Sequence, residues 1–442
     1  MSTPSITVTP DSKTVMVTAT SQMPTTFMKL LGVDAMTVSA SSTVIRNGRG
    51  VELVLVMDNT GSMRSAVGGS STNKITAMKN AAKKLVDILY NGRETIDNFY
   101  VELVPYAAMV NIGNNNTGWV TRPGGGDWAW WANSVYYSGT IWKGCVMARA
   151  DPYDETDDPP SVAKWEVMAW SSTKDITFKD KYGNDIRVRK NGNWQNVAGD
   201  NNWPPIDESN NAQNNGTGPN LGCPPAITPL IQDKTDVDTA IDQMQPWHRG
   251  GTMSNLGLAW GWRVISPRWR GLWNGVPEDH PLDYNTPNWD KVVILLTDGT
   301  NEWYDWDGDG HKGDDGKTPL NGLPGKAGFS SSSSANVKSG DVPDDTDYGA
   351  YGRISANRLG TTSNGSAHTV LDNKMKRMCT FLRQNGVIVY TLTFGATSSS
   401  TEDTFEQCAG RPDRYFASPT NEDLESAFIA IATEINNLRI SE

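Results

Sequence analysis

The stretch DNTGSM, which directly follows an apolar run, carries oxygen-bearing side chains at alternate positions: Asp58, Thr60 and Ser62. On a loop after a buried strand, alternate side chains can converge on one point. Carboxylate and hydroxyl oxygens are the ligands that hard divalent cations such as Mg²⁺ prefer. The same residue types also form Asx and Ser/Thr turns that cap a following helix, and for an isolated pattern this is the commoner outcome. The stretch alone therefore leaves a cation site and a capping turn open.

Two later segments add candidate ligands. The segment GGTMSNLGLAWGWR places Thr252 on a glycine-flanked loop before a helical stretch, and VVILLTDGTN places Asp298 at the end of another apolar run. In this chain order the three parts resemble the metal-ion-dependent adhesion site of von Willebrand factor A (vWA) domains, in which DxSxS is followed by Thr and then Asp. The resemblance implies that Thr60 and Ser62 bind the ion through hydroxyls and that Thr252 binds it directly or through water. It implies that Asp58 and Asp298 bind the ion directly or contact the residues that bind it.

The resemblance also indicates what such a site does. Few of its innermost ligands are charged, so the cation stays electrophilic and open to a carboxylate from a partner. Thr60 stands where the family most often has Ser, which keeps the hydroxyl and adds a methyl group. The expected ion is Mg²⁺, with Ca²⁺ or Mn²⁺ as alternatives. Because the constellation has no positioned base, we expect a binding protein and not an enzyme.

Three almost continuously apolar segments are the strands expected to position these residues: VELVLVM at 51–57, VVILLT at 292–297 and VIVYTLTF at 387–394. Each has the length of a strand and lacks alternation, which is typical of parallel strands covered by helices on both faces. Each of the first two ends next to a candidate ligand.

Helical periodicity is visible at 74–90 and again at the end of the chain, where Thr420 or Asn421 can serve as N-cap. Strands that alternate with helices predict an α/β fold with a doubly wound, mainly parallel sheet of the vWA, Rossmann-like kind. In such folds ligands bind beyond the carboxyl ends of the strands, where Asp58 and Asp298 fall.

Two long segments interrupt this pattern and are expected to be inserted subdomains or functional loops. Residues 111–230 are rich in Trp, and residues 300–366 are acidic and Ser-rich. The expected vWA domain then consists of 49–110 and 231–442. Residues 1–48 are expected to form a small β element, because SITVTPDSKTVMVTAT predicts two short strands around a turn.

Charge and hydropathy exclude some functions of this 442-residue chain. Its 50 acidic and 39 basic residues give a formal charge of -11, so a nucleic-acid partner is not expected. No apolar run approaches the roughly 20 residues needed to span a bilayer. A membrane contact is expected only through an N-terminal segment absent from this chain.

The resemblance extends over nearly the whole chain. The blocks that carry it are, in order, ITVTPDSKTVMVTATSQMPTTFMKLLGVDAMTVSASS, VLVMDNTGSM, WKGCVMARA, PLIQDKTDVDTAIDQM, GGTMSNLGLAWGWRVISP, ILLTDGTN, MCTFLRQNGVIVYTLTF and EINNLRIS. They are similar to TadG-type proteins of the tight-adherence (Tad/Flp) pilus system. This resemblance implies an exported bacterial protein of the cell surface, the pilus or the periplasm, with a hydrophobic helix upstream of the residues in this chain.

The resemblance implies a role in pilus assembly or adhesion. The leading hypothesis is a minor pilin-like or tip adhesin that engages pilus subunits, or a carboxylate-bearing extracellular ligand, through the cation. An alternative is an assembly factor anchored in the inner membrane, in which the metal is structural. A carbohydrate-active enzyme is less favoured, because it needs two carboxylates at a fixed separation in a cleft and the sequence supplies no privileged pair.

Export makes disulfides chemically reasonable for the four cysteines, none of which belongs to a CxxC pair. Cys145 and Cys223 lie in the first insertion, and Cys379 and Cys408 flank the last predicted strand. We therefore predict these two pairs.

The segment DWDGDGHKGDDG is a candidate second calcium site. Asp305, Asp307 and Asp309 have the spacing of a calcium loop, but Gly316 occupies the position of the bidentate Glu. A calcium loop and a solvated acidic loop both remain open.

Two further features of the first insertion have structural interpretations. Nine of the 17 tryptophans fall between residues 119 and 203. They can form a surface that stacks on sugars or partners, or a small local core, and a core is favoured because Trp is usually buried. The acidic run at 151–158 predicts a solvated loop.

Overall fold

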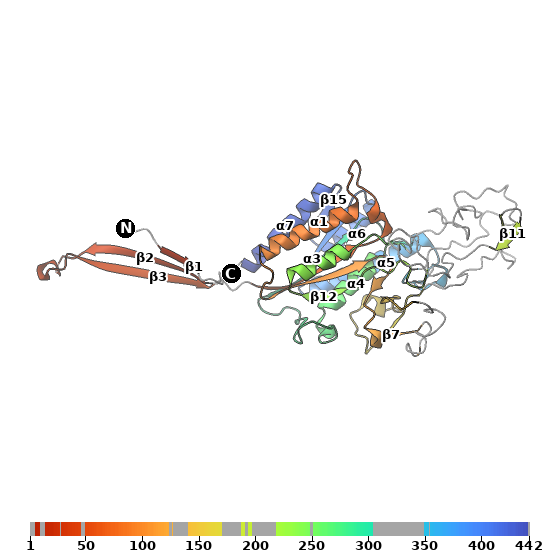
Figure 1. The fold of residues 1–442 in the computed structure, drawn as a ribbon, viewed down its shortest axis with the longest axis horizontal. Coiled ribbons are helices and arrows are strands. Elements are labelled where there is room, and N and C mark those ends of the chain that lie inside the picture. The colour runs from red at the N-terminus through yellow and green to blue at the C-terminus, as the bar shows by residue number, and fades with distance from the viewer. Residues whose placement is uncertain are drawn as a thin grey trace.

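An eight-stranded mixed sheet forms the centre of the protein in the computed structural model (Figure 1). The structure describes residues 5–8, 14–26, 28–45, 49–122, 126, 140–169, 187–190, 193–196, 218–247, 251–303, 349–352 and 354–440. The strands, in order across the sheet, are β15 (Tyr415–Ser418), β14 (Ile388–Phe394), β13 (Trp289–Thr297), β4 (Gly50–Asp58), β5 (Phe99–Tyr106), β6 (Val110–Asn111) and β8 (Cys145–Val146). The strand β12 (Thr228–Ile231) pairs with β5 off this path.

Five neighbouring strands of this sheet, from β15 to β5, are parallel, whereas β6, β8 and β12 pair antiparallel. The three strands predicted from apolar runs are β4, β13 and β14, and they lie side by side at the centre. Buried residues run through β4 without a break. The expected α/β fold with a mainly parallel sheet is therefore confirmed for the part of the chain that the structure describes.

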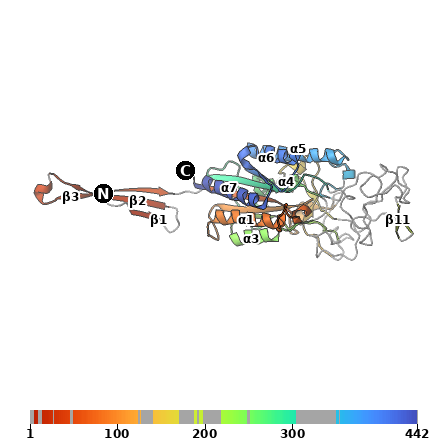
Figure 2. The same ribbon diagram turned by 90° about the horizontal axis from the view of Figure 1, so that it is seen from above.

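Helices cover both faces of the sheet, as Figure 2 shows. The helices α1 (Lys74–Tyr90), α3 (Lys234–Gln243) and α7 (Asn421–Ile440) share one apolar core with Leu53 and Leu55 of β4. The helices α4 (Ser254–Ile265), α5 (Asn364–Gln384) and α6 (Ser399–Ala409) share the other core with Val54 and Val56. No helix in the described part of the chain has the length and apolar character needed to cross a bilayer.

The predicted helix boundaries agree with the structure. The periodic segment 74–90 is α1, whose N-cap Asn73 accepts a hydrogen bond from the backbone N–H of Thr76. Thr420, one of the two predicted N-caps, accepts a hydrogen bond from the backbone N–H of Asp423 at the start of α7. Short 3-10 turns lie at Met28–Leu31, Gly61–Arg64, Thr117–Trp119, Tyr153–Glu155, Pro267–Trp269, Ile354–Ala356 and Pro412–Arg414.

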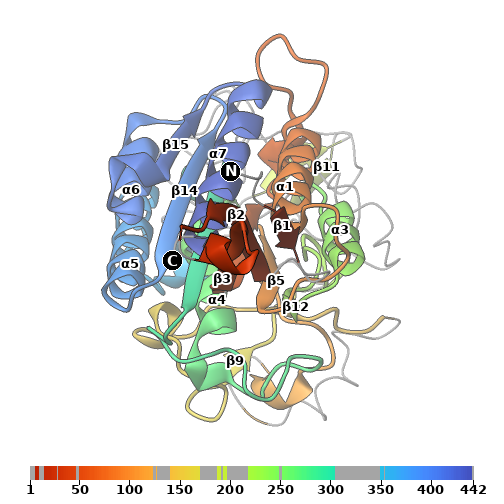
Figure 3. The ribbon, with the colours of Figure 1, turned by 90° about the vertical axis from the view of Figure 1, so that its left-hand side faces the viewer.

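A three-stranded antiparallel sheet precedes the α/β body. It consists of β1 (Ser5–Val8), β2 (Thr14–Pro24) and β3 (Ala35–Ile45), and it projects from the body in Figure 1 and is seen end on in Figure 3. The register places Met23 opposite Met36, so these residues share a face with Val38, and all three are about half exposed. The opposite face carries mainly Ser and Thr. The two predicted strands are present, and a third pairs with them.

The first long insertion is continuous with the central sheet, because β8 and β12 belong to both. Its described remainder includes the parallel pair β7 (Val120–Thr121) and β9 (Trp165–Glu166), and the hairpin β10 (Arg187–Lys190) and β11 (Asn193–Asn196). Trp142 and Trp165 are buried, as predicted for a core. This core is shared with the α/β body, since the ring of Trp165 lies 4.8 Å from that of Trp260 in α4. The side chains of Trp128, Trp130, Trp131, Trp170, Trp194 and Trp203 lie outside the described residues.

The prediction of a solvated acidic loop at 151–158 is wrong, because two of its carboxylates are buried against distant cations. Asp154 forms an ion pair of 3.0 Å with Lys374 of α5, and Asp157 forms one of 2.8 Å with Arg268. The buried Arg263 of α4 donates hydrogen bonds to backbone carbonyls of the same loop. The loop therefore anchors the first insertion to the helices.

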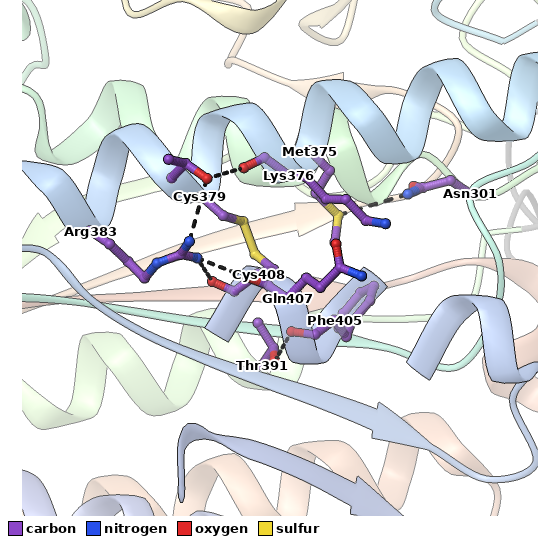
Figure 4. Close-up of a disulfide and its surroundings, with 10 residues drawn as sticks. Asn301, Met375, Lys376, Cys379, Arg383, Thr391, Phe405, Gln407 and Cys408 are labelled. Carbon is purple, nitrogen blue, oxygen red and sulfur yellow. Dashed lines mark hydrogen bonds between the residues drawn. A yellow bond between two sulfur atoms is a disulfide. The ribbon is translucent and has the colours of Figure 1, made fainter. Parts of the chain in front are cut away.

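The cysteines form the two predicted disulfides, Cys145–Cys223 and Cys379–Cys408. The first joins β8 to the chain segment before β12. The second joins α5 to α6, and Figure 4 shows that Arg383 of α5 also reaches the backbone carbonyl of Cys408. Both helices are thereby fixed to each other over one face of the sheet.

We expect the double substitution Cys379→Ala/Cys408→Ala to lower the free energy of unfolding by about 3–4 kcal/mol, because it releases a crosslink in the unfolded chain. The closed loop spans 29 residues. Urea denaturation under non-reducing conditions measures the change. An unfolding free energy equal to that of the wild type would contradict the expected contribution.

A buried cluster of charges lies under α4. Glu52 of β4 accepts hydrogen bonds from Lys291 and from the backbone N–H of Leu282, and it contacts His280. Glu102 of β5 is fully buried, and its carboxyl oxygens have no hydrogen-bond partner among the described residues. Burial, reinforced by the charge of Glu52, raises the pKa of Glu102 well above its usual range.

This environment predicts a pH-dependent stability. The pKa of Glu102 is higher in the folded than in the unfolded chain. Its contribution to the free energy of unfolding is therefore fully present below the unfolded pKa, and it is lost as the pH rises through the folded pKa. Glu102→Gln should therefore lose less stability than the wild type between about pH 5 and about pH 8. Denaturation at both pH values tests this, with the exposed Glu425→Gln as control. Parallel pH profiles for wild type and Glu102→Gln would contradict it.

Candidate metal centre

The candidate site lies where two parallel strands end side by side. Asp58 is the last residue of β4, and Asp298 directly follows β13, its neighbour. From β4 the chain passes through α1 to β5 on one side, and from β13 it passes through α5 to β14 on the other. In α/β sheets, ligands bind at such a divergence, beyond the carboxyl ends of the strands.

Asp58 forms the base of the site, and its oxygens are occupied by donors of the protein. One oxygen accepts the backbone N–H of Thr60 at 2.8 Å, which makes an Asx turn. The other accepts the Thr297 hydroxyl at 2.9 Å, the backbone N–H of Asp298 at 3.2 Å and the Tyr106 hydroxyl at 3.3 Å. Complete burial and, secondly, the Asp298 charge raise the pKa of Asp58 to about 7.

The hydroxyls of Thr60 and Ser62 point to the second carboxylate instead of capping a helix. Thr60 makes no side-chain capping bond to the 3-10 turn that follows it. Its Oγ1 lies 3.0 Å from Ser62 Oγ, and Ser62 Oγ donates to Asp298 Oδ1 at 2.6 Å. Ser62 is exposed, whereas the other members of this chain of oxygens are buried. The structure thus brings four of the five candidate ligands into one hydrogen-bonded network that opens at Ser62.

Thr252 lies beside this network without a hydrogen bond from its hydroxyl to the other four candidates. Its backbone pairs with Glu302 through two hydrogen bonds, of 2.8 and 2.9 Å. A Cβ atom placed on Gly299, the residue after Asp298, would lie 3.9 Å from Thr252 Oγ1. The backbone pairing therefore holds Thr252 against the loop that carries Asp298.

The donor set fits a hard cation. It comprises two carboxylates and three hydroxyls, and oxygen ligands of this kind suit Mg²⁺, Ca²⁺ and Mn²⁺. Across the described ranges no group of three or more His, Cys, Asp or Glu side chains is arranged to hold a metal, so a softer nitrogen or sulfur site finds no support there. The candidate calcium loop with Asp305, Asp307 and Asp309 lies outside the described residues.

Sequence reasoning missed three residues that the network uses: Lys74, Tyr106 and Thr297. Lys74 Nζ forms an ion pair of 2.9 Å with Asp298 Oδ2. Thr297 directly precedes Asp298, so its position at the end of a strand was an available signal. Tyr106 ends β5, a strand that was not predicted, and the pairing of Lys74 with a residue 224 positions away leaves no local signal.

A cavity of about 370 Å³ lies at the opposite end of the central strands, where β4 and β13 begin. Arg49, Trp289 and Asn285 are among its lining residues. None of the five candidate ligands lines it, so the cavity is separate from the candidate metal centre.

Comparison with known proteins gives distant similarities to solved structures. No family model and no curated protein matches the chain. The solved pilus adhesin SpaC of Lactobacillus rhamnosus GG aligns with 99% of this chain and 34% of its own, at 11% identity and a TM-score of 0.36. The vWF domain of the type V pili tip protein Mfa5 of Porphyromonas gingivalis aligns with 89% of this chain and 97% of its own, at 11% identity and a TM-score of 0.38.

A third solved structure is proximal thread matrix protein 1 of the mussel byssus with a zinc-occupied MIDAS motif. It aligns with 89% of this chain and 47% of its own, at 13% identity and a TM-score of 0.33. The chain thus spans about a third of SpaC and about half of the byssus protein. At such low TM-scores, the α/β architecture rests on the strand order and pairing of this chain itself.

Two glycines of α4 allow a test of how Tyr106 supports the site. A Cβ on Gly257 would lie 2.5 Å from Tyr106 Cδ1, and one on Gly261 would lie 2.6 Å from Val56 Cγ2. Overpacking of this kind costs about 1–3 kcal/mol, offset by up to about 1 kcal/mol of helix propensity. We expect Gly257→Ala and Gly261→Ala to destabilise the fold similarly, and only Gly257→Ala to weaken Mg²⁺ binding as well. Denaturation and calorimetric titration check this, and equal losses of affinity would contradict it.

Proposed function

We propose that the protein is a metal-dependent binding protein. Thr60, Ser62 and Asp298 are proposed to hold the cation together with Thr252, and Asp58 to support them from behind. The cation, Mg²⁺ in the first place with Ca²⁺ or Mn²⁺ as alternatives, supplies an electrophilic centre that accepts a carboxylate from a partner. This assignment makes the role of the protein adhesion and not catalysis.

The observation that carries the proposal is the run of oxygens from Asp58 to the exposed Ser62. Thr297, Tyr106 and backbone N–H groups already donate hydrogen bonds to the oxygens of Asp58, so this side chain is fixed in position and has no oxygen free to act as a base. The hydroxyls of Thr60 and Ser62 are neutral, so they orient a cation without reducing its charge. Ser62 is the exposed member, and a partner can therefore approach from its side.

The biological setting of the proposal comes from the resemblance of the sequence blocks to TadG-type proteins. On that basis we propose an exported protein of the Tad pilus, acting as a minor pilin-like or tip adhesin toward pilus subunits or an extracellular ligand. The domain organisation proposed with it is an N-terminal β element at 1–48 and a vWA domain at 49–110 and 231–442, with insertions at 111–230 and 300–366. The second candidate is an assembly factor in which the metal only braces the loops.

Alanine substitution of Ser62 tests the site with little risk to the fold, because this side chain is exposed. We expect Ser62→Ala to weaken Mg²⁺ binding roughly tenfold or more, as loss of a group at a metal site commonly does. Isothermal titration calorimetry measures the affinity. Ser65→Ala, three residues along and also exposed, is the matched control and should bind Mg²⁺ like the wild type.

The same proteins separate the two candidate functions. A metal that mediates binding predicts that a chelator abolishes attachment to purified pilus while the protein stays folded. A bracing metal predicts that the chelator lowers the melting temperature while the folded fraction still attaches. No Mg²⁺ binding by the wild type, or equal affinities for Ser62→Ala and Ser65→Ala, would rule out the proposed site.

A further inference from the structure

Lys74 places a fixed positive charge at the candidate metal centre. Its Nζ lies 2.9 Å from Asp298 Oδ2, and the carboxylate side chain is completely buried, whereas that of Lys74 is 13% exposed. The other oxygen of the same carboxylate accepts the Ser62 hydroxyl. Asp298 is therefore shared between the lysine and the oxygens proposed to hold the cation.

Two elements hold the lysine in this position. Lys74 is the first residue of α1, and its backbone N–H donates to the carbonyl of Ser65 at 2.9 Å. Its side chain passes over Gly395, which directly follows β14 and has a φ of 79°. A Cβ on Gly395 would lie 3.2 Å from Lys74 Cε and 3.4 Å from Nζ. A glycine at that position leaves the space through which the lysine reaches Asp298.

The charges of the network can be counted. Asp58 and Asp298 contribute two negative charges when ionised, Lys74 contributes one positive charge, and the hydroxyls contribute none. A divalent cation would bring the total to plus one, and a carboxylate from a partner would bring it to zero. Without Lys74, the cation alone would neutralise the two carboxylates, and the partner's carboxylate would leave an excess negative charge.

We propose that Lys74 is the specificity-determining residue of this centre, making cation binding weaker and the bound cation more selective for an anionic ligand. This inference rests on the proposed function. The positive charge repels the cation within a buried network, where charges interact more strongly than in water. The same charge favours the carboxylate that follows. Lys74 thus couples the two binding events through electrostatics.

The first part of the test is calorimetric titration with Mg²⁺. Lys74→Met removes the charge at nearly constant length, and Lys74→Gln removes the charge but keeps a donor for Asp298. We expect both variants to bind Mg²⁺ roughly tenfold tighter than the wild type. Lys83→Met is the matched control, since Lys83 lies on the same helix and pairs with Asp242, away from the site. Its affinity should equal that of the wild type.

The second part uses acetate as the anionic probe. Mg²⁺ titrations are repeated in acetate and in chloride at equal ionic strength, with the affinity of acetate for free Mg²⁺ measured separately. Acetate should strengthen Mg²⁺ binding in the wild type and in Lys83→Met, and by reciprocity the ion strengthens acetate binding by the same factor. In Lys74→Met and Lys74→Gln this strengthening should be severalfold smaller.

Tighter Mg²⁺ binding together with a smaller effect of acetate identifies the role of the charge. Damage to the fold would instead weaken the binding of both ligands. Unchanged or weaker Mg²⁺ binding in both Lys74 variants overturns the inference and leaves the proposed metal centre standing. Equal strengthening by acetate in variants and wild type also overturns it. If the wild type does not bind Mg²⁺, the proposed function fails and the inference fails with it.

Discussion

Two carboxylates buried at the ends of adjacent strands are the constraint on which the candidate site depends. The parallel pairing of β4 with β13 fixes Asp58 and Asp298 next to each other, and burial removes the water that would screen their repulsion. The structure compensates from two directions. Neutral donors surround Asp58, and the ammonium of Lys74 meets Asp298. The groups that compensate the two carboxylates come from three elements: Thr297 from β13, Lys74 from α1 and Tyr106 from the end of β5.

Helix α4 connects the surroundings of Asp58 to the first insertion. On its sheet side, Gly257 leaves room for the ring of Tyr106, whose hydroxyl reaches Asp58. At its start, Asn255 donates to the hydroxyl of Tyr351, which in turn donates to the buried Asp154 of the insertion. Unpaired charges and polar groups in such positions are costly, so these hydrogen bonds fix the insertion against the helix. A continuous set of buried polar contacts thus joins the first insertion to the helix that lies under the site.

The central part of the fold was predictable from sequence because β4, β13 and β14 are buried on both faces and have uniformly apolar sequences. The strand β5 escaped prediction because Glu102 and Pro105 interrupt its apolar pattern. Four of the five candidate ligands, Asp58, Thr60, Ser62 and Asp298, lie in one network, and the sequence pointed to them because they follow apolar strands and resemble the adhesion-site motif. Lys74 and the buried Asp154 were not predictable, because their partners lie 224 and 220 residues away and local composition contains no information about them.

The two carboxylates, Asp58 and Asp298, differ in the groups that surround them. Asp58 is saturated by hydrogen bonds, and its raised pKa shows that burial and Asp298 still outweigh them. Asp298 is compensated by Lys74, whose side chain is 13% exposed, and by the hydroxyl of the exposed Ser62. Asp298 is therefore the carboxylate that contacts the exposed Ser62, whereas the partners of Asp58 are buried or backbone groups. The proposed binding centre uses this division: Asp58 keeps the geometry while a ligand is gained and lost at Asp298.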